Sequence, residues 1–305
     1  MIASMVTFCA PVAAQPSAFS FGVIARLDSA SADAAWWRDM LHETDADSLA
    51  FVVANGIKAG TEPCTDKLYE RRKSMLEEAK NGVILSLTAS DWSDCTTSQG
   101  KSAAIDRLGR MRDMFFTDDF SFGASKIPVL RQSTTPKFRS YGENARWEIG
   151  DVIFATINIP ANNNHYVTDA GRNSEFEDRL IANRDWLKRV HLSATHRKLA
   201  GIVLFCDGNP LLAPDTTGFF NRRAKRDGFA ETRKLIGEMA EKYPGKVLVI
   251  HGQGTPTTTA KGINWNKNLG DLNVGSDWLK LTVNAANPNL FVVNREPVEQ
   301  KNASN

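Results

Sequence analysis

The sequence has little net charge, few cysteines and no long apolar run. Lysine and arginine number 37 against 35 for aspartate and glutamate, which gives a formal net charge of +2. So small an excess creates no strong electrostatic field, and we expect no nucleic-acid partner. No stretch approaches the roughly 20 apolar residues of a transmembrane helix, so we expect no membrane span. The sequence also lacks a nucleophile elbow, a P-loop and the glycine fingerprint of dinucleotide-binding folds.

The cysteines favour a disulfide over a zinc site. No two of the four stand in a CxxC pair, the spacing typical of zinc ligands. Cys206 lies in an apolar run and is expected to be a buried free thiol. Cys64 and Cys95 follow two successive predicted strands, so both can lie at the same edge of a sheet. In an exported protein these two residues are candidates for a disulfide.

The N-terminal stretch MIASMVTFCAPVAAQ carries no charged side chain. Ile2 to Val12 is mostly apolar but too short to span a bilayer. Val12-Ala13-Ala14 has the small residues of a signal-peptidase site, although the usual basic segment before it is missing. Either translation starts upstream or the signal is atypical; the alternative is an ordinary disordered N-terminus. We expect residues 1–14 to be a signal peptide and the protein to be periplasmic or secreted.

The rest of the pattern predicts one α/β domain at residues 19–297 and a polar tail at 298–305. Short apolar runs are expected to be buried strands at 21–25, 50–54, 83–87, 202–206 and 247–250. Helices are expected at 32–42, 66–80, 102–116, 174–196 and 218–243, with Gly228 interrupting the last pattern. The segments 146–159 and 278–293 are each expected to form a hairpin. A layered α/β core with extra antiparallel strands at the sheet edges follows.

Short motifs, in order along the chain, resemble those of one enzyme family. They are FGVI at 21–24, IKAG at 57–60, EPCTD at 62–66, DWSDC at 91–95, NIP at 158–160, NNN at 162–164, GRN at 171–173, EF at 175–176 and VIHG at 249–252. Together they make residues 19–297 similar to the calcineurin-like metallophosphoesterases, most closely to an exported bacterial branch. The resemblance implies a layered fold of central β-sheets flanked by helices, with antiparallel edge strands. It also places a disulfide at Cys64 and Cys95.

The resemblance further implies a two-metal centre at the strand ends. Two neighbouring cations clamp a phosphate and generate hydroxide, and one aspartate bridges them. The positions that the resemblance assigns to metal ligands hold other residues here: Arg26, Gly56, Ser90, Gln253 and Thr255. Arg26 carries a positive charge that it cannot lose, and Gly56 has no side chain with which to bridge two metals. The metal-ligand motifs are therefore degenerate, and no cofactor is expected.

We predict a non-catalytic site that binds an anionic small molecule or a protein partner. The candidate pocket residues lie near predicted strand ends: Arg26, Asp28, Asn55, Asp91, Asn162, Asp207, His251 and Gln253. The alternative is an active metal-dependent phosphoesterase, a hydrolase whose divergent or mononuclear site holds Mn, Fe or Zn. In that alternative Asp207 and His251 are the catalytic candidates. A purely structural protein of the cell envelope is a third interpretation.

Two of these residues admit opposed interpretations. The Arg26 guanidinium could stand in for a lost cation and bind a phosphate or carboxylate. The favoured interpretation is that Arg26 pairs with Asp28 or Asp207 and fills the vacated space. His251 could be a base or a lone metal ligand, but no second histidine is predicted beside it. We therefore expect His251 to be a hydrogen-bonded structural histidine.

Overall fold

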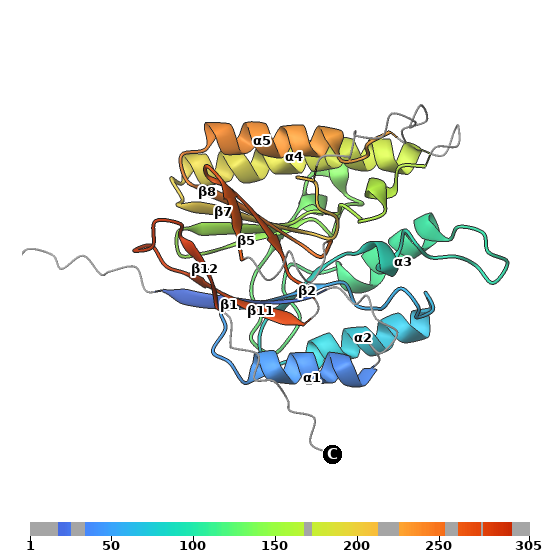
Figure 1. The fold of residues 1–305 in the computed structure, drawn as a ribbon. Helices are drawn as coiled ribbons and strands as arrows, with labels where there is room; N and C mark the ends of the chain where they lie inside the picture. The colour runs from blue at the N-terminus through green and yellow to red at the C-terminus, as the bar shows by residue number, and fades with distance from the viewer. Residues whose placement is uncertain are drawn as a thin grey trace, which may run out of the picture.

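The chain folds into two β-sheets that face each other, with helices on both outer sides, as Figure 1 shows for the computed structural model. The structure describes residues 18–25, 34–167, 173–212, 226–253, 262–275 and 277–294. In Figure 1, α4 and α5 lie above one sheet, and α1 and α2 lie below the other. The layers are therefore helices, sheet, sheet and helices, which confirms the layered α/β fold predicted from the sequence.

The first sheet takes strands from both ends of the described chain, in the spatial order β12-β11-β1-β2-β3. Its strands are β1 (Phe19–Ile24), β2 (Val52–Asn55), β3 (Val83–Ser86), β11 (Trp278–Val283) and β12 (Phe291–Asn294). Strands β1, β2 and β3 run parallel, whereas β11 and β12 are antiparallel additions at the edge. The helices on this side are α1 (Ala34–Asp45), α2 (Asp66–Glu78) and α3 (Ala104–Phe115).

The second sheet has the spatial order β4-β5-β6-β7-β8-β10-β9. Its strands are β4 (Leu130–Arg131), β5 (Ala145–Ile149), β6 (Val152–Thr156), β7 (Gly201–Cys206), β8 (Lys246–His251), β9 (Asn264–Asn266) and β10 (Leu269–Asn273). The helices α4 (Ser174–His196) and α5 (Ala230–Lys242) cover it. Strands β6, β7 and β8 run parallel, so their carboxyl ends meet at one edge.

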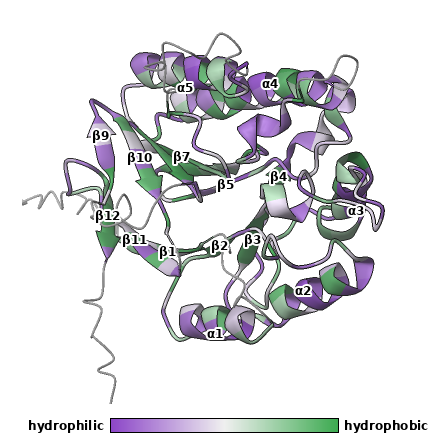
Figure 2. Ribbon diagram, turned by 45° about the vertical axis from the view of Figure 1, so that its right-hand side comes forward, coloured by the Kyte–Doolittle hydropathy of each residue, from purple (hydrophilic) through white to green (hydrophobic). Residues whose placement is uncertain are grey.

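An aromatic cluster fills the space between the sheets. The Phe21 and Phe51 rings stack with centroids 5.0 Å apart, and Trp147 stacks on Phe205 at 5.9 Å. Burying one such side chain contributes about 1.5–3 kcal/mol. Because successive strand residues point to opposite faces, the intervening residues form two further apolar clusters beneath the helices. Figure 2 shows the result: mostly green strands inside and purple residues on the helices outside.

The predicted hairpins are present, but one helix starts later than expected. β5 and β6 pair across Gly150-Asp151, and β11 pairs with β12. Helix α5 begins at Ala230, and residues 226–229 are not helical; residues 213–225 lie outside the described ranges. At Gly228 a Cβ would come within 2.1 Å of the Asn163 carbonyl oxygen. This close approach requires glycine and breaks the helical pattern that the sequence suggested.

Strands β9 and β10 were not predicted. The β10 sequence LGDLN has neither a continuous apolar run nor several β-branched residues. It forms a strand because β8 offers a free edge, with which it pairs in parallel over residues 269–273. Tertiary pairing thus decided this element against weak local preference.

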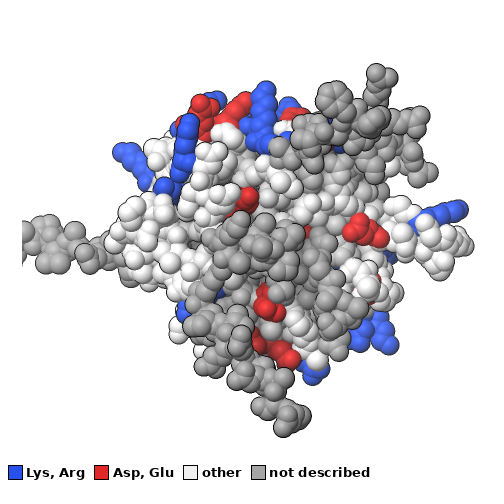
Figure 3. All heavy atoms as spheres, in the orientation of Figure 1, with Lys and Arg blue, Asp and Glu red and all other residues white. Residues whose placement is uncertain are grey.

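The described helices do not include one with both the length and the apolar character of a membrane span. Their outer faces are charged. In the view of Figure 3, Lys and Arg side chains over α4 and α5 are mixed with Asp and Glu. Pairs such as Arg233 with Asp227 show the same interspersion. This agrees with the small net charge.

Cys64 and Cys95 form the disulfide that the sequence predicts, with 5.9 Å between their Cα atoms. The bond ties the chain before α2 to the loop after β3, at the carboxyl ends of β2 and β3. Cys95 is buried, and its sulfur lies 3.7 Å from the Tyr69 hydroxyl. Cys206 is a buried free thiol, as predicted.

Replacing both bridged cysteines with alanine is expected to lower the free energy of unfolding by about 3 kcal/mol. The bond closes a loop with a sequence separation of 31, which restricts the unfolded chain. Urea unfolding followed by circular dichroism measures the change. Wild-type protein in reductant is the control and should match the variant; equal stability of oxidised wild type and variant would contradict the expectation.

Candidate functional site

Polar loops gather at the carboxyl ends of the parallel strands. We call residues 55–60, 87–95, 157–165 and 207–209 the strand-end region; they follow β2, β3, β6 and β7 respectively. In open α/β sheets this edge is where ligands bind. Hydrogen bonds described below join the loops of one sheet to those of the other, so the region is continuous across the sandwich.

Asp91 is fully buried at the end of a short 3-10 helix, η1 (Ala89–Asp91), and both carboxylate oxygens are engaged. Oδ1 accepts the Ile57 amide at 3.0 Å. Oδ2 accepts the Thr88 amide at 2.8 Å and the Thr88 hydroxyl at 2.9 Å. Burial raises the pKa of Asp91 to about 6, against the opposing effect of these bonds and of Lys58. Asp91 therefore holds two loops together.

Gly56 faces a space that Thr88 fills. Its φ is +86°, and a Cβ there would lie 2.6 Å from Thr88 Oγ1 and 2.8 Å from Thr88 Cγ2. The same Cβ would be 3.3 Å from Asp91 Oδ2. Thr88 is itself fully buried and bonded to Asp91 and Ser90. At the position where the resemblance places a bridging aspartate, there is thus no room for a carboxylate.

Asp207 is fully buried and links the two halves of the sandwich. Its Oδ2 accepts the Ala89 amide at 2.7 Å and the Ala161 amide at 2.8 Å. Ala89 follows β3 in the first sheet, whereas Ala161 follows β6 in the second. The two amides compensate the buried oxygen and fix the spacing of the loops.

Asn162 makes a second link across the same gap. Its Oδ1 accepts the Ser93 hydroxyl at 3.1 Å, and its Nδ2 donates to Asp94 Oδ1 at 2.7 Å. The strand-end region therefore brings together four of the predicted pocket residues: Asn55, Asp91, Asn162 and Asp207.

Four polar atoms in or directly beside this region are buried without a hydrogen-bond partner. They are Trp92 Nε1, the side-chain oxygens of Asn55 and Asn158, and the hydroxyl of Ser86, which lies one residue before the region. Asn55 and Ser86 pair in the β2–β3 ladder and, by strand alternation from Val53 and Ile84, face the space between the sheets. Each unsatisfied group lowers the stability of the fold by about 1–3 kcal/mol, so the need to fold does not explain why it is there.

His251 lies on the other face of the second sheet. Val249 packs beneath the helices and Ile250 between the sheets, so His251 points to the helix side with Val249. Its Nε2 lies 2.6 Å from Asp271 Oδ1 on β10, and its Nδ1 is buried without a partner. Asp207, by contrast, bonds to a loop of the opposite sheet. The two catalytic candidates therefore point to opposite faces of the second sheet, although their backbones are neighbours at the ends of β7 and β8.

Of the remaining candidates, Gln253 adjoins the strand-end region, and the others are not described. The Gln253 side-chain oxygen accepts the Asn209 amide at 2.8 Å, on the side of Asp271, to which Asn209 Nδ2 donates. Arg26, Asp28 and Thr255 lie outside the described residues, so their roles stay predictions.

Buried cations that the sequence reasoning missed support the IKAG loop. Lys58 donates from Nζ to the Ala59 and Ser90 carbonyls, each at 2.8 Å. Burial lowers the pKa of Lys58, against the raising effect of Asp91. Arg72 bonds the Ile57 carbonyl and pairs with Glu62 at 2.7 Å.

Arg72 is buried in spite of its charge, since only 2% of it is exposed. Its spacing gave a usable signal. Arg72 lies four residues from both Leu68 and Leu76, which are buried, and so shares their side of α2.

Arg179 on α4 anchors the NNN loop and was also missed. It is fully buried, bonds Glu175 at 2.6 Å and donates to the Asn158 and Asn164 carbonyls at 3.2 and 2.9 Å. Its guanidinium lies 5.5 Å from the centroid of the Trp92 ring. Position 179 gave a partial sequence signal, because Glu175 stands four residues before it on the same helix, whereas its other partners, Asn158 and Asn164, come from other elements.

The donor set in the described ranges does not fit two metal ions. No three His, Cys, Asp or Glu side chains of these ranges lie together in a way that could hold one. Asp91 accepts three hydrogen bonds, Asp207 accepts those of the Ala89 and Ala161 amides, and Gly56 has Thr88 against it. We therefore derive no metal-dependent step for this region.

Comparison with known proteins matches the fold but no sequence family. No family model and no curated protein matches the chain. Among solved structures it is similar to PhoD, with a TM-score of 0.52 and 10% identity over 90% of this chain and 65% of PhoD. The fold is that of a metallophosphoesterase.

The coverage and the sequence identity limit what the similarity to PhoD shows. The chain covers less than two thirds of PhoD, and 10% identity transfers the metallophosphoesterase fold alone. A phosphatase from Mycoplasma pneumoniae also matches, with a TM-score of 0.43 and 8% identity over 93% of this chain and 96% of that one. That lower score carries no argument.

Proposed function

We propose that this protein is an exported, non-catalytic form of the metallophosphoesterase fold. In place of a dinuclear metal centre, its strand-end region binds an anionic ligand or a protein partner. The observation that carries the proposal is the contact of Gly56 with Thr88. A buried threonine side chain stands 2.6 Å from where a Cβ of residue 56 would begin.

The charge of the region supports the absence of a dinuclear centre. Two divalent cations bring about four positive charges, which carboxylates around them must offset. Asp91 and Asp207 instead accept amide and hydroxyl hydrogen bonds, while buried Lys58 supplies a positive charge beside Asp91. The carboxylates stabilise the loops through these hydrogen bonds.

Buried polar groups without hydrogen-bond partners at the same edge support a binding role. The Asn55 oxygen and the Ser86 hydroxyl are buried without partners between the sheets. Such groups are retained at a cost, and functional sites are where that cost is usually found. The disulfide at this edge and the signal-like N-terminus support export.

Metal analysis together with an activity assay tests the proposal. Purified protein is expected to contain no stoichiometric Mn, Fe or Zn. With added Mn²⁺ it is expected to hydrolyse bis(p-nitrophenyl) phosphate no faster than the Asp207→Asn variant does. That substitution keeps the shape of the side chain and an oxygen acceptor for the loop amides.

The active-phosphoesterase alternative gives a different result. Stoichiometric metal, with turnover that Asp207→Asn abolishes, would overturn the proposal. Asp113→Asn is the matched control, because Asp113 is exposed on α3 and its replacement removes the same charge. Circular dichroism of both variants confirms that each is folded.

A further inference from the structure

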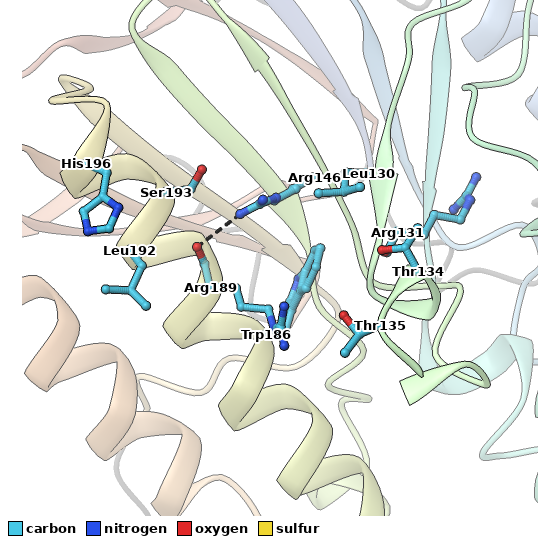
Figure 4. Close-up of a pocket in the computed structure, with 10 residues that line it drawn as sticks. All are labelled: Leu130, Arg131, Thr134, Thr135, Arg146, Trp186, Arg189, Leu192, Ser193 and His196. Carbon is cyan, nitrogen blue, oxygen red and sulfur yellow. Dashed lines mark hydrogen bonds between the residues drawn. The ribbon is translucent and has the colours of Figure 1, made fainter. Parts of the chain in front are cut away.

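A second candidate site lies at the edge of the second sheet, away from the strand-end region. A pocket of about 230 Å³ opens between β4, the short helix η2 (Gln132–Thr134), β5 and the C-terminal half of α4. Figure 4 shows its lining residues: Leu130, Arg131, Thr134, Thr135, Arg146, Trp186, Arg189, Leu192, Ser193 and His196. None of these belongs to the strand-end region, so the pocket is independent of the site in the proposed function.

The lining is basic and contains no Asp or Glu. Arg131 is held in place by the Asp118 and Gly142 carbonyls. Arg189 pairs with Asp185, one turn back on α4, at 2.6 Å. Arg146 donates to the Arg189 carbonyl at 3.1 Å, the bond drawn in Figure 4.

Arg146 is an arginine of this lining that the described carboxylates leave unpaired. A guanidinium has five N–H groups. Within the described ranges no carboxylate lies within ion-pair distance of it, and Glu148, its neighbour in sequence, pairs with Arg197 instead. Arg146 is partly buried, and this burial lowers its pKa. The group remains charged and can receive an oxyanion.

An apolar floor and hydroxyl groups complete the pocket. The Arg146 guanidinium lies 5.9 Å from the centroid of the Trp186 ring, which is fixed by a 3.0 Å bond from its Nε1 to the Thr156 carbonyl. Leu130 and Leu192 are 44% and 52% exposed at the rim. Thr135 and Ser193 add hydroxyl donors.

We propose that this pocket binds a small organic anion, a carboxylate or phosphate group carried on an apolar body. The anion contacts Arg146 and Arg189, and the apolar part rests on Trp186 and Leu192. Charge selects the anion over neutral or cationic compounds, because Arg146 has no ion-pair partner among the described residues, whereas Arg189 is paired with Asp185. The volume limits the ligand to about the size of a single substituted ring.

Titration calorimetry with four probes tests the chemistry: phenyl phosphate, benzoate, inorganic phosphate and neutral benzyl alcohol. Phenyl phosphate or benzoate is expected to bind at least about tenfold more tightly than benzyl alcohol and inorganic phosphate, since both parts of the pocket are used. Comparing phenyl phosphate with benzoate tells which anion is preferred. Failure of both to bind at 10 mM (roughly the weakest affinity of use), or equal binding of benzyl alcohol, would overturn the proposal.

Variants locate the site. Arg146→Gln is expected to weaken the preferred probe at least about tenfold, the loss of one charge-assisted contact. Arg71→Gln is the matched control, because Arg71 is exposed on α2 and makes the same change of charge. An equal loss in both variants would contradict the assignment. Amide shifts of Thr135 and Ser193 on adding the probe to wild-type protein give a second measure that needs no variant. Metal binding at the strand ends would not alter either result.

Discussion

Gly56→Asp is expected to lower the free energy of unfolding by at least about 4 kcal/mol. Three costs combine: a side chain at φ +86°, a Cβ 2.6 Å from Thr88 Oγ1, and a carboxylate pressed toward Asp91 in a buried place. Urea unfolding of the variant measures the loss. The change restores the residue that the family resemblance places here, so it also tests directly whether the space for a bridging carboxylate exists.

Two further variants separate the steric cost of Gly56→Asp from the cost of burying its carboxylate. Gly56→Ala carries the backbone and contact costs without the carboxylate and is expected to lose about 2–4 kcal/mol. Combining Gly56→Asp with Thr88→Ala is expected to cost at least about 1 kcal/mol less than the sum of the single losses, because the obstructing side chain is removed. If the Gly56→Asp variant is as stable as wild type and binds stoichiometric Mn²⁺, Thr88 does not block the space beside residue 56. That result would contradict the proposed function.

Arg179→Met is expected to lower the free energy of unfolding by about 3–5 kcal/mol. Methionine keeps the length of the side chain but leaves the Glu175 carboxylate buried without its cation, and it frees the Asn158 and Asn164 carbonyls. The matched control is Arg184→Met on the same helix. Arg184 is 45% exposed and pairs with Glu231 at the surface, so its loss should stay within about 1 kcal/mol.

The pH dependence of the same variant gives an independent readout. Burial alone would raise the pKa of Glu175, but the Arg179 charge and hydrogen bonds from His165 and Arg179 lower it to about 2. In wild type this contribution is fully present above about pH 4.5 and is lost as the pH falls toward 2. Without Arg179 the buried carboxylate should prefer its proton, so the variant should gain stability between pH 7 and 5. Parallel pH profiles of wild type and variant would contradict this account.

The metallophosphoesterase fold and the chemistry of this chain point in different directions. The layers and the parallel strands give a fold similar to that of PhoD. In the loops, however, Asp91 and Asp207 bind amides, and His251 faces the helices with Asp271. A scaffold can keep its shape while its site changes, because core packing and site chemistry depend on different residues.

The sequence by itself determined much of the architecture. Apolar runs such as 83–87 and 202–206 predicted buried strands, since a strand buried on both faces must be apolar throughout. The order of loops predicted which cysteines would meet, because the ends of neighbouring parallel strands share an edge. Glycine at position 56 excluded a bridging carboxylate there, since the residue type alone settles that point.

Only the tertiary structure decided what the polar residues do. Asp207 and Ala89 are 118 positions apart, and no local pattern predicts their hydrogen bond. The direction of His251 depends on strand register, because a shift by one residue would turn its side chain to the other face. Thr88 fills the space beside Gly56 only because two loops converge there. Side-chain contacts between distant segments form when the sheets pack, so local sequence cannot specify them.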